Sequence, residues 1–84
     1  MYYVYLLVNE NGKIYIGYTS DLKRRMREHN CSKSGFTKGR RWKLVYYEAY
    51  LSKKDAIRRE KRLKDGRARR QLIERISNSK SLVI

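Results

Sequence analysis

The sequence predicts a small α/β fold of the α+β kind: a three-stranded sheet with an N-terminal β-hairpin, flanked by helices, in the order β-β-α-β-α-α. Two apolar, tyrosine-rich runs, residues 2–8 and 14–19, lie on either side of a turn sequence. A third alternating run, residues 42–50, lies between two segments whose apolar residues recur at helical spacing. At 84 residues, the chain is long enough for one domain with a thin core.

The hairpin is predicted from Asn11-Gly12, because a tight turn between strands needs positive φ at its centre. Pairing of the two runs would bring Tyr5 and Tyr15 close together on one sheet. The first run is apolar on both faces, so we expect it to be covered on both sides. Gly17 inside the second run predicts a close backbone approach or a bulge.

Capping residues predict where the helices begin. Ser20 can cap a helix over residues 21–29, and Ser52 begins a capping-box-like start for a helix that runs to about Leu63. Gly66 is expected to end or bend that helix, and residues 67–76 form another helical segment. We therefore expect a single domain over residues 1–76, followed by a flexible tail over residues 77–84.

In the third strand, strict alternation predicts that one face carries Trp42, Leu44, Tyr46, Glu48 and Tyr50. Trp42 would then be a core residue, the alternative being a side chain that stacks on a nucleic-acid base.

The charge of the chain points to a polyanionic partner. There are 22 Lys and Arg residues against 8 acidic ones, which gives a formal net charge of +14. A solvated basic surface is the plain alternative, but so large an excess mixed with aromatic residues favours nucleic acid, DNA first. The candidate backbone contacts are Lys38, Arg40, Arg41, Arg67, Arg69 and Arg70.

Other classes of protein fit the composition less well. One Cys and one His are too few for a disulfide or a structural zinc site within the chain. No apolar run approaches the ~18 residues of a membrane-spanning helix, and no signal-peptide pattern is present. We expect an intracellular, cytoplasmic protein that is a monomer by default.

Three polar residues lie on the inward sides of the predicted helices. Arg25 and His29 lie at the inward edge of the first helix, where the alternatives are a packed arginine stem and a polar residue at the helix end. Glu60 lies on the apolar stripe of the second helix. A carboxylate there needs a cation, either a basic side chain in a salt bridge or a metal ion.

Taken together, these residues resemble the GIY-YIG nucleases. Tyr3-Val4-Tyr5 stands in place of Gly-Ile-Tyr, Tyr15-Ile16-Gly17 matches Tyr-Ile-Gly, and Arg25, His29 and Glu60 follow at matching places. The resemblance extends to about Leu72 and is closest to small single-domain members. Tyr3 replaces the first glycine of the motif, and Tyr18 stands where other members have a lysine.

The resemblance implies an endonuclease that hydrolyses phosphodiester bonds with a divalent metal, Mg²⁺ or Mn²⁺, held by Glu60. Tyr15 would be the general base, with Tyr5 as a positioning donor, Arg25 stabilising the phosphate and His29 orienting it or assisting proton transfer. Positive charge nearby would favour the phenolate form that a base needs. With no evident element for reading bases, structure-selective or weakly sequence-selective cleavage in DNA processing or repair is expected. The alternatives are a non-catalytic nucleic-acid-binding module of the same fold and a catalytic subunit that relies on a partner for specificity.

Overall fold

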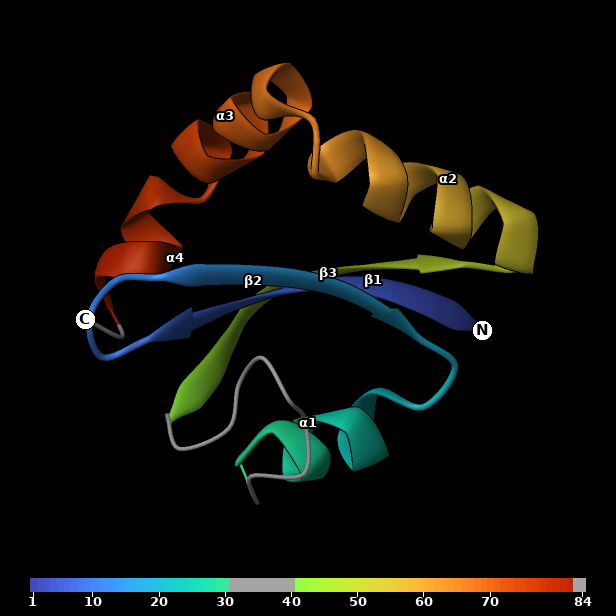
Figure 1. The fold of residues 1–84 in the computed structure, drawn as a ribbon, viewed down its shortest axis with the longest axis horizontal. Coiled ribbons are helices and arrows are strands. Elements are labelled where there is room, and N and C mark those ends of the chain that lie inside the picture. The colour runs from blue at the N-terminus through green and yellow to red at the C-terminus, as the bar shows by residue number, and fades with distance from the viewer. Residues whose placement is uncertain (31–40, 83–84) are drawn as a thin grey trace.

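The computed structural model describes residues 1–30 and 41–82 and has the predicted fold class: a three-stranded sheet between two layers of helices. The strands pair in the order β2-β1-β3, and both pairings are antiparallel. Figure 1 shows α1 on one face of the sheet and α2, α3 and α4 on the other. The elements are β1 (Tyr2–Asn9), β2 (Ile14–Thr19), α1 (Leu22–Asn30), β3 (Trp42–Tyr50), α2 (Lys53–Leu63), α3 (Gly66–Arg75) and α4 (Ser77–Ser81).

The hairpin between β1 and β2 is confirmed. Gly12 has a φ of 80°, and its amide donates to the Asn9 carbonyl over 3.0 Å. The buried Asn9 side chain accepts from the amides of Asn11 and Lys13, each over 2.9 Å. The turn therefore satisfies its polar groups locally. In the register that it sets, Leu7 lies opposite Tyr15 in the sheet.

Strand β1 lies in the middle of the sheet and is covered on both faces, as its sequence predicts. Val4, Leu6 and Val8 pack with α2 and α3 in one core cluster. Tyr5 and Leu7 pack with Trp42 in a second cluster on the α1 side. Trp42 is thus a core residue, with only 4% of its surface exposed.

The prediction that β3 alternates without interruption was wrong. Leu6 pairs with Tyr46 but Leu7 pairs with Leu44, so Val45 is an extra residue in the strand. A bulge of this kind shifts the side-chain alternation by one position. Trp42 and Leu44 consequently face α1, whereas Tyr46, Glu48 and Tyr50 face α2.

The helix boundaries differ from the predictions at two places. The Asp21 carboxylate, rather than Ser20, caps α1 by accepting from the Arg24 amide over 3.0 Å. Ser52 caps α2 as predicted, with the Asp55 amide donating to its hydroxyl over 3.4 Å. The segment expected to be a tail contains the short helix α4, which contacts β3. The flexibility of residues 77–84 remains a prediction.

Candidate active site

The Tyr5 hydroxyl is the centre of a polar cluster between the sheet and α1. It lies 2.9 Å from Nε2 of His29, and Nε of Arg25 donates to it over 3.3 Å. Tyr5 is 1% exposed and His29 is fully buried. Strand β1 supplies the tyrosine, and residues one turn apart on α1 supply the other two.

The Tyr15 ring completes this cluster from β2. Its centroid lies 4.9 Å from the His29 ring in an edge-on contact and 6.2 Å from the Tyr5 ring. Tyr15 is only half-buried, so it is the cluster's more accessible tyrosine. The structure thus brings together four of the five predicted catalytic residues, here called the Tyr–Arg cluster: Tyr5, Tyr15, Arg25 and His29.

Gly17 explains why the second motif ends in glycine. It pairs with Tyr5 across the hairpin, and the Tyr5 side chain crosses directly over it. A Cβ at this position would lie 2.4 Å from the Tyr5 hydroxyl oxygen and 2.9 Å from Cε1 of Tyr15. Because real Cβ atoms do not approach other atoms so closely, the glycine lets Tyr5 reach toward the β2 edge.

Burial and hydrogen bonds together set the charges of Tyr5, His29 and Arg25. Burial raises the pKa of Tyr5 to about 12, although the hydrogen bond from Arg25 opposes this effect. Burial and the neighbouring Arg25 charge lower the pKa of His29 to about 4. Burial also opposes the charge of Arg25, but its hydrogen bonds to Glu28 and Tyr5 outweigh this and raise its pKa. At neutral pH Tyr5 is therefore a neutral phenol, His29 is a neutral imidazole and Arg25 is a guanidinium ion.

Glu28 is a supporting residue that the sequence reasoning missed. Its carboxylate accepts from Nη1 of Arg25 over 2.9 Å, and this hydrogen bond lowers the pKa of Glu28. The spacing of three residues on one helix was the available signal. Arg25 thus donates through Nε to Tyr5 and through Nη1 to Glu28.

Glu60 lies in the other helical layer, on α2. Its carboxylate is 3.5 Å from Nζ of Lys64, and its side chain is 21% exposed. Arg59 reaches from one side of α2 to Glu48 on β3, while Lys64 lines a hollow of about 260 Å³ with Ile14–Ile16 of β2. Glu60 therefore lies on the side of α2 that faces β2, but within the described ranges it makes no hydrogen bond or ion pair with the Tyr–Arg cluster.

Comparison with known proteins gives a family match over most of the chain. The family model for the GIY-YIG catalytic domain matches residues 1–72. The chain belongs to the GIY-YIG family. It is 45% identical over 60 residues to a UPF0213 protein of Streptococcus agalactiae (69% of this chain, 68% of the relative) and 38% identical over 76 residues to one of Halobacterium salinarum (87% and 99%).

A solved structure also supports the fold. The solution NMR structure of a UPF0213 protein from Bacillus halodurans matches with a TM-score of 0.56 and 38% identity, covering 88% of this chain and 84% of that one. GIY-YIG domains form a nuclease superfamily, so the resemblance of the two tyrosine motifs is confirmed at the level of the family.

Few side chains in the described part of this GIY-YIG domain are placed to hold a metal ion together. Across residues 1–30 and 41–82, no three or more His, Cys, Asp and Glu side chains gather where they could hold an ion. The Glu28 carboxylate is engaged by Arg25, and His29 is engaged by Tyr5. Glu60 on α2 is paired with Lys64, whose exposed ammonium could yield it to an ion. Mg²⁺ is commonly bound by one or two carboxylates with water and phosphate oxygens.

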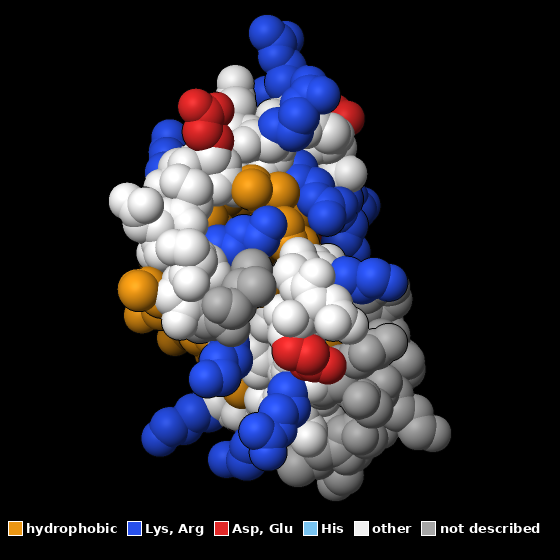
Figure 2. All heavy atoms as spheres, turned by 90° about the vertical axis from the view of Figure 1, so that its left-hand side faces the viewer, with side chains coloured by type: hydrophobic (Ala, Val, Ile, Leu, Met, Phe, Trp, Pro, Cys, Tyr) orange, Lys and Arg blue, Asp and Glu red, His pale blue; other side chains and the backbone are white. Residues whose placement is uncertain are grey.

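The predicted nucleic-acid contacts lie in several places. Lys38 and Arg40 are outside the described residues, and Arg41 is exposed just before β3. Arg67 and Arg70 are exposed on α3, while the half-buried Arg69 lines the same hollow as Tyr15 and Lys64. Figure 2 shows basic side chains over both helical layers on one face of the molecule.

No helix in the described part of this GIY-YIG domain has the length and apolar character needed to cross a membrane.

Proposed function

We propose that this GIY-YIG domain is a small metal-dependent endonuclease that hydrolyses phosphodiester bonds in DNA. The observation that carries the proposal is the Tyr–Arg cluster, in which Arg25 and His29 meet on the Tyr5 hydroxyl beside the Tyr15 ring. Such a cluster joins a fixed cation to groups that can hold or move a proton, as phosphodiester hydrolysis requires.

Arg25 would bind the phosphate and stabilise the charge that develops on it. Its Nε and Nη1 atoms are held by Tyr5 and Glu28, which fixes the plane of the guanidinium before a substrate arrives. A guanidinium held in this way donates to phosphate oxygens with little loss of conformational freedom. Arg25 is half-buried, so part of it remains open to a ligand.

The two tyrosines would have different tasks. Tyr5 is buried and its pKa is raised to about 12, which keeps it a neutral positioning residue for Arg25 and His29. Tyr15 is more accessible and is our candidate for the general base toward the attacking water. His29 stays neutral near pH 7 and would orient groups or assist proton transfer.

Glu60 would hold Mg²⁺ or Mn²⁺, with water and substrate phosphate completing the coordination. When bound, the ion would neutralise phosphate charge and favour ionisation of nearby water or phenol. The proposed site extends around the β2 edge, because the Tyr–Arg cluster lies on one face of the sheet and α2 on the other. Lys64 would have to yield its ion pair with Glu60 when the metal binds.

We further infer that cleavage is structure-selective or weakly sequence-selective and belongs to DNA processing or repair in the cytoplasm. The candidate contacts are arginines suited to phosphates, which supply affinity without reading sequence: Arg41, Arg67, Arg69 and Arg70.

A second candidate function is a nucleic-acid-binding module without catalysis. The ion pair between Glu60 and Lys64 favours it, because that pair is also a sufficient structural reason for the carboxylate.

A cleavage assay separates the two candidates. Labelled single-stranded, duplex and branched DNA would be incubated with the protein in Mg²⁺, Mn²⁺ or a chelator. We expect metal-dependent products, lost by at least about 100-fold in Arg25→Ala because a transition-state donor is removed. Arg24→Ala, an exposed neighbour on the same helix, is the matched control and should keep nearly full activity. Binding of every substrate without cleavage in any metal would instead support the binding module.

A further inference from the structure

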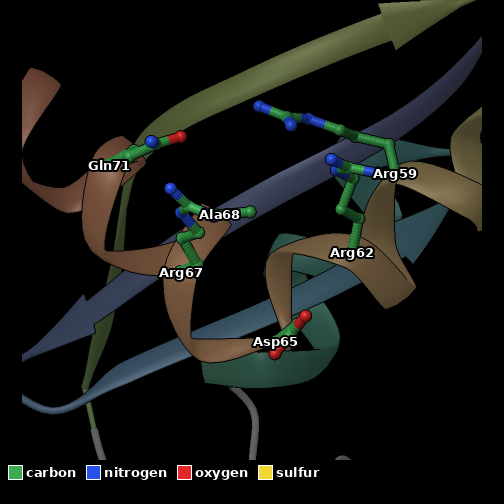
Figure 3. Close-up of a pocket in the computed structure, with 6 residues that line it drawn as sticks. All are labelled: Arg59, Arg62, Asp65, Arg67, Ala68 and Gln71. Atoms are coloured by element: carbon green, nitrogen blue, oxygen red, sulfur yellow. The ribbon is translucent and has the colours of Figure 1, made fainter.

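A second basic site lies between α2 and α3, in the helical layer opposite α1. It is a hollow of about 500 Å³ open to solvent. Figure 3 shows the Arg59 guanidinium and the Gln71 amide pointing toward one another across it, with Asp65 at the end near the turn between the helices. Its lining consists of Arg59, Arg62, Asp65, Arg67, Ala68 and Gln71.

Arg59 is held in place from behind. Its Nε lies 2.9 Å from Oε1 of Glu48, and its Nη2 lies 3.0 Å from Oε2. The hydroxyls of Tyr46 and Tyr50 both donate to the same carboxylate. This leaves Nη1 of Arg59 without a hydrogen bond to any described residue and able to donate into the hollow.

The other two arginines lack a compensating carboxylate. Among residues 1–30 and 41–82, neither Arg62 nor Arg67 forms an ion pair or a side-chain hydrogen bond. Asp65 also lines the hollow, but it forms no ion pair with Arg62 or Arg67, because its carboxylate lies more than 4.0 Å from their basic nitrogens. Two unpaired guanidiniums around one space repel each other, and an anion between them would relieve that repulsion.

We propose that this hollow binds a phosphate group of a nucleic-acid backbone. Guanidiniums bind phosphate oxygens through forked pairs of N–H donors, and the Gln71 amide adds a neutral donor to the same lining. The choice of nucleic acid rather than a free phosphate compound rests on the proposed function and on the net charge of +14. The site is separate from the Tyr–Arg cluster, because the sheet lies between them.

The test measures binding rather than cleavage, so its outcome does not depend on whether the protein is a nuclease. The affinity of the full chain for a fluorescein-labelled DNA oligonucleotide would be measured in EDTA at several salt concentrations. The test variant carries Arg62→Gln and Arg67→Gln. The control carries Lys54→Gln and Lys61→Gln, which remove the same charge from exposed positions of α2 that do not line the hollow.

We expect the Arg62→Gln, Arg67→Gln variant to bind roughly 10-fold or more weakly than the control, with a salt slope reduced by about 1.4 to 1.8 for two lost contacts. Equal affinity and slope in the two variants would overturn the proposal. Titration with inorganic phosphate, followed by NMR of the arginine Nε–H groups, provides the second arm. Saturable phosphate binding that only the test variant loses, with unchanged DNA affinity, would overturn the assignment to nucleic acid.

Discussion

The candidate site depends on one group, the Tyr5 hydroxyl. It is buried, it contacts residues from α1, and it reaches them by crossing Gly17 of β2. Burial keeps the Tyr5 phenol neutral, although Arg25 opposes this effect, and Arg25 itself keeps its charge. A change at Gly17 or His29 therefore tests the arrangement without replacing the proposed base, Tyr15, itself.

Gly17→Ala should displace the Tyr5 side chain, because the new Cβ would lie 2.4 Å from its hydroxyl oxygen and 2.6 Å from Cζ. We expect a loss of about 1–3 kcal/mol in the free energy of unfolding, as for other overpacked cores. Urea unfolding followed by far-UV circular dichroism measures it. Gly66→Ala is the control, since no atom lies within 4 Å of its Cβ position, and it should be neutral or slightly stabilising.

His29 should make stability depend on pH in a defined window. Its pKa is about 4 in the folded protein, against an ordinary value of 6.5, so the unfolded chain binds the proton more readily. Stability is therefore complete above about pH 6.5 and falls as the pH drops toward 4, with a loss of about 2 kcal/mol between pH 7 and pH 5.

Within the described ranges, the titratable and charged groups beside His29 include Tyr5 from β1, Tyr15 from β2, and Arg25 and Glu28 from its own helix. Denaturant unfolding at a series of pH values tests the effect. In His29→Gln the slope between pH 7 and pH 5 should vanish, whatever the absolute stability of that variant. A slope of the same size in both proteins would contradict the role of His29.

At the scale of elements, one sheet separates two helical layers that are attached in different ways. Helix α1 is joined to the sheet mainly through the Tyr–Arg cluster and Leu22 and Met26. Helix α2 is joined by apolar packing and by the Glu48–Arg59 pair, whose side chains are only 14% and 28% exposed. The carboxylate of Glu48 is satisfied by three partners, so its removal leaves several half-buried polar groups without it.

Glu48→Ala should cost about 2–3 kcal/mol in the free energy of unfolding, somewhat less than the loss of one partner from a fully buried pair. Asp55→Ala is the matched control. Its ion pair with Arg58 spans 3.8 Å between side chains that are 52% and 78% exposed, and it should cost less than about 1 kcal/mol. Thermal unfolding of both variants gives the comparison, and equal losses would mean that the Glu48 network does not stabilise the docking of α2.

The elements that the sequence predicted correctly depend on local chemistry. The Asn-Gly turn, the Ser52 cap and the two covered faces of β1 each follow from neighbouring residues. Arg25 and His29 were also placed correctly, because helical spacing decides which face a side chain occupies.

The features that were missed depend on contacts between distant segments. The bulge at Val45 arises from the register of β3 against β1, which the alternation of one strand does not reveal. The contact between Gly17 and Tyr5 was visible only as a glycine within a strand. Glu60 lies on α2, in the other helical layer, which one helix's apolar stripe does not reveal; its place in one site with the Tyr–Arg cluster stays a prediction.

At the scale of the whole molecule, basic side chains cover both helical layers and give the net charge of +14. Binding to nucleic acid should therefore release many counterions. If the six predicted contacts all reach phosphates, the logarithm of the association constant should fall with the logarithm of salt concentration with a slope of about −4 to −5. Fluorescence anisotropy in EDTA measures this slope, and a value shallower than about −1 would show that the basic surface does not track a backbone.

The most direct test of the account is the single-turnover cleavage rate of Glu60→Gln in Mg²⁺, measured beside wild type and Tyr15→Phe. If Glu60 and the Tyr–Arg cluster form one nuclease site around the β2 edge, both substitutions should lower the rate by at least about 100-fold while leaving DNA affinity nearly unchanged. Glu74→Gln, an exposed carboxylate on α3, should cleave like wild type. Cleavage by Glu60→Gln at the wild-type rate would contradict the account.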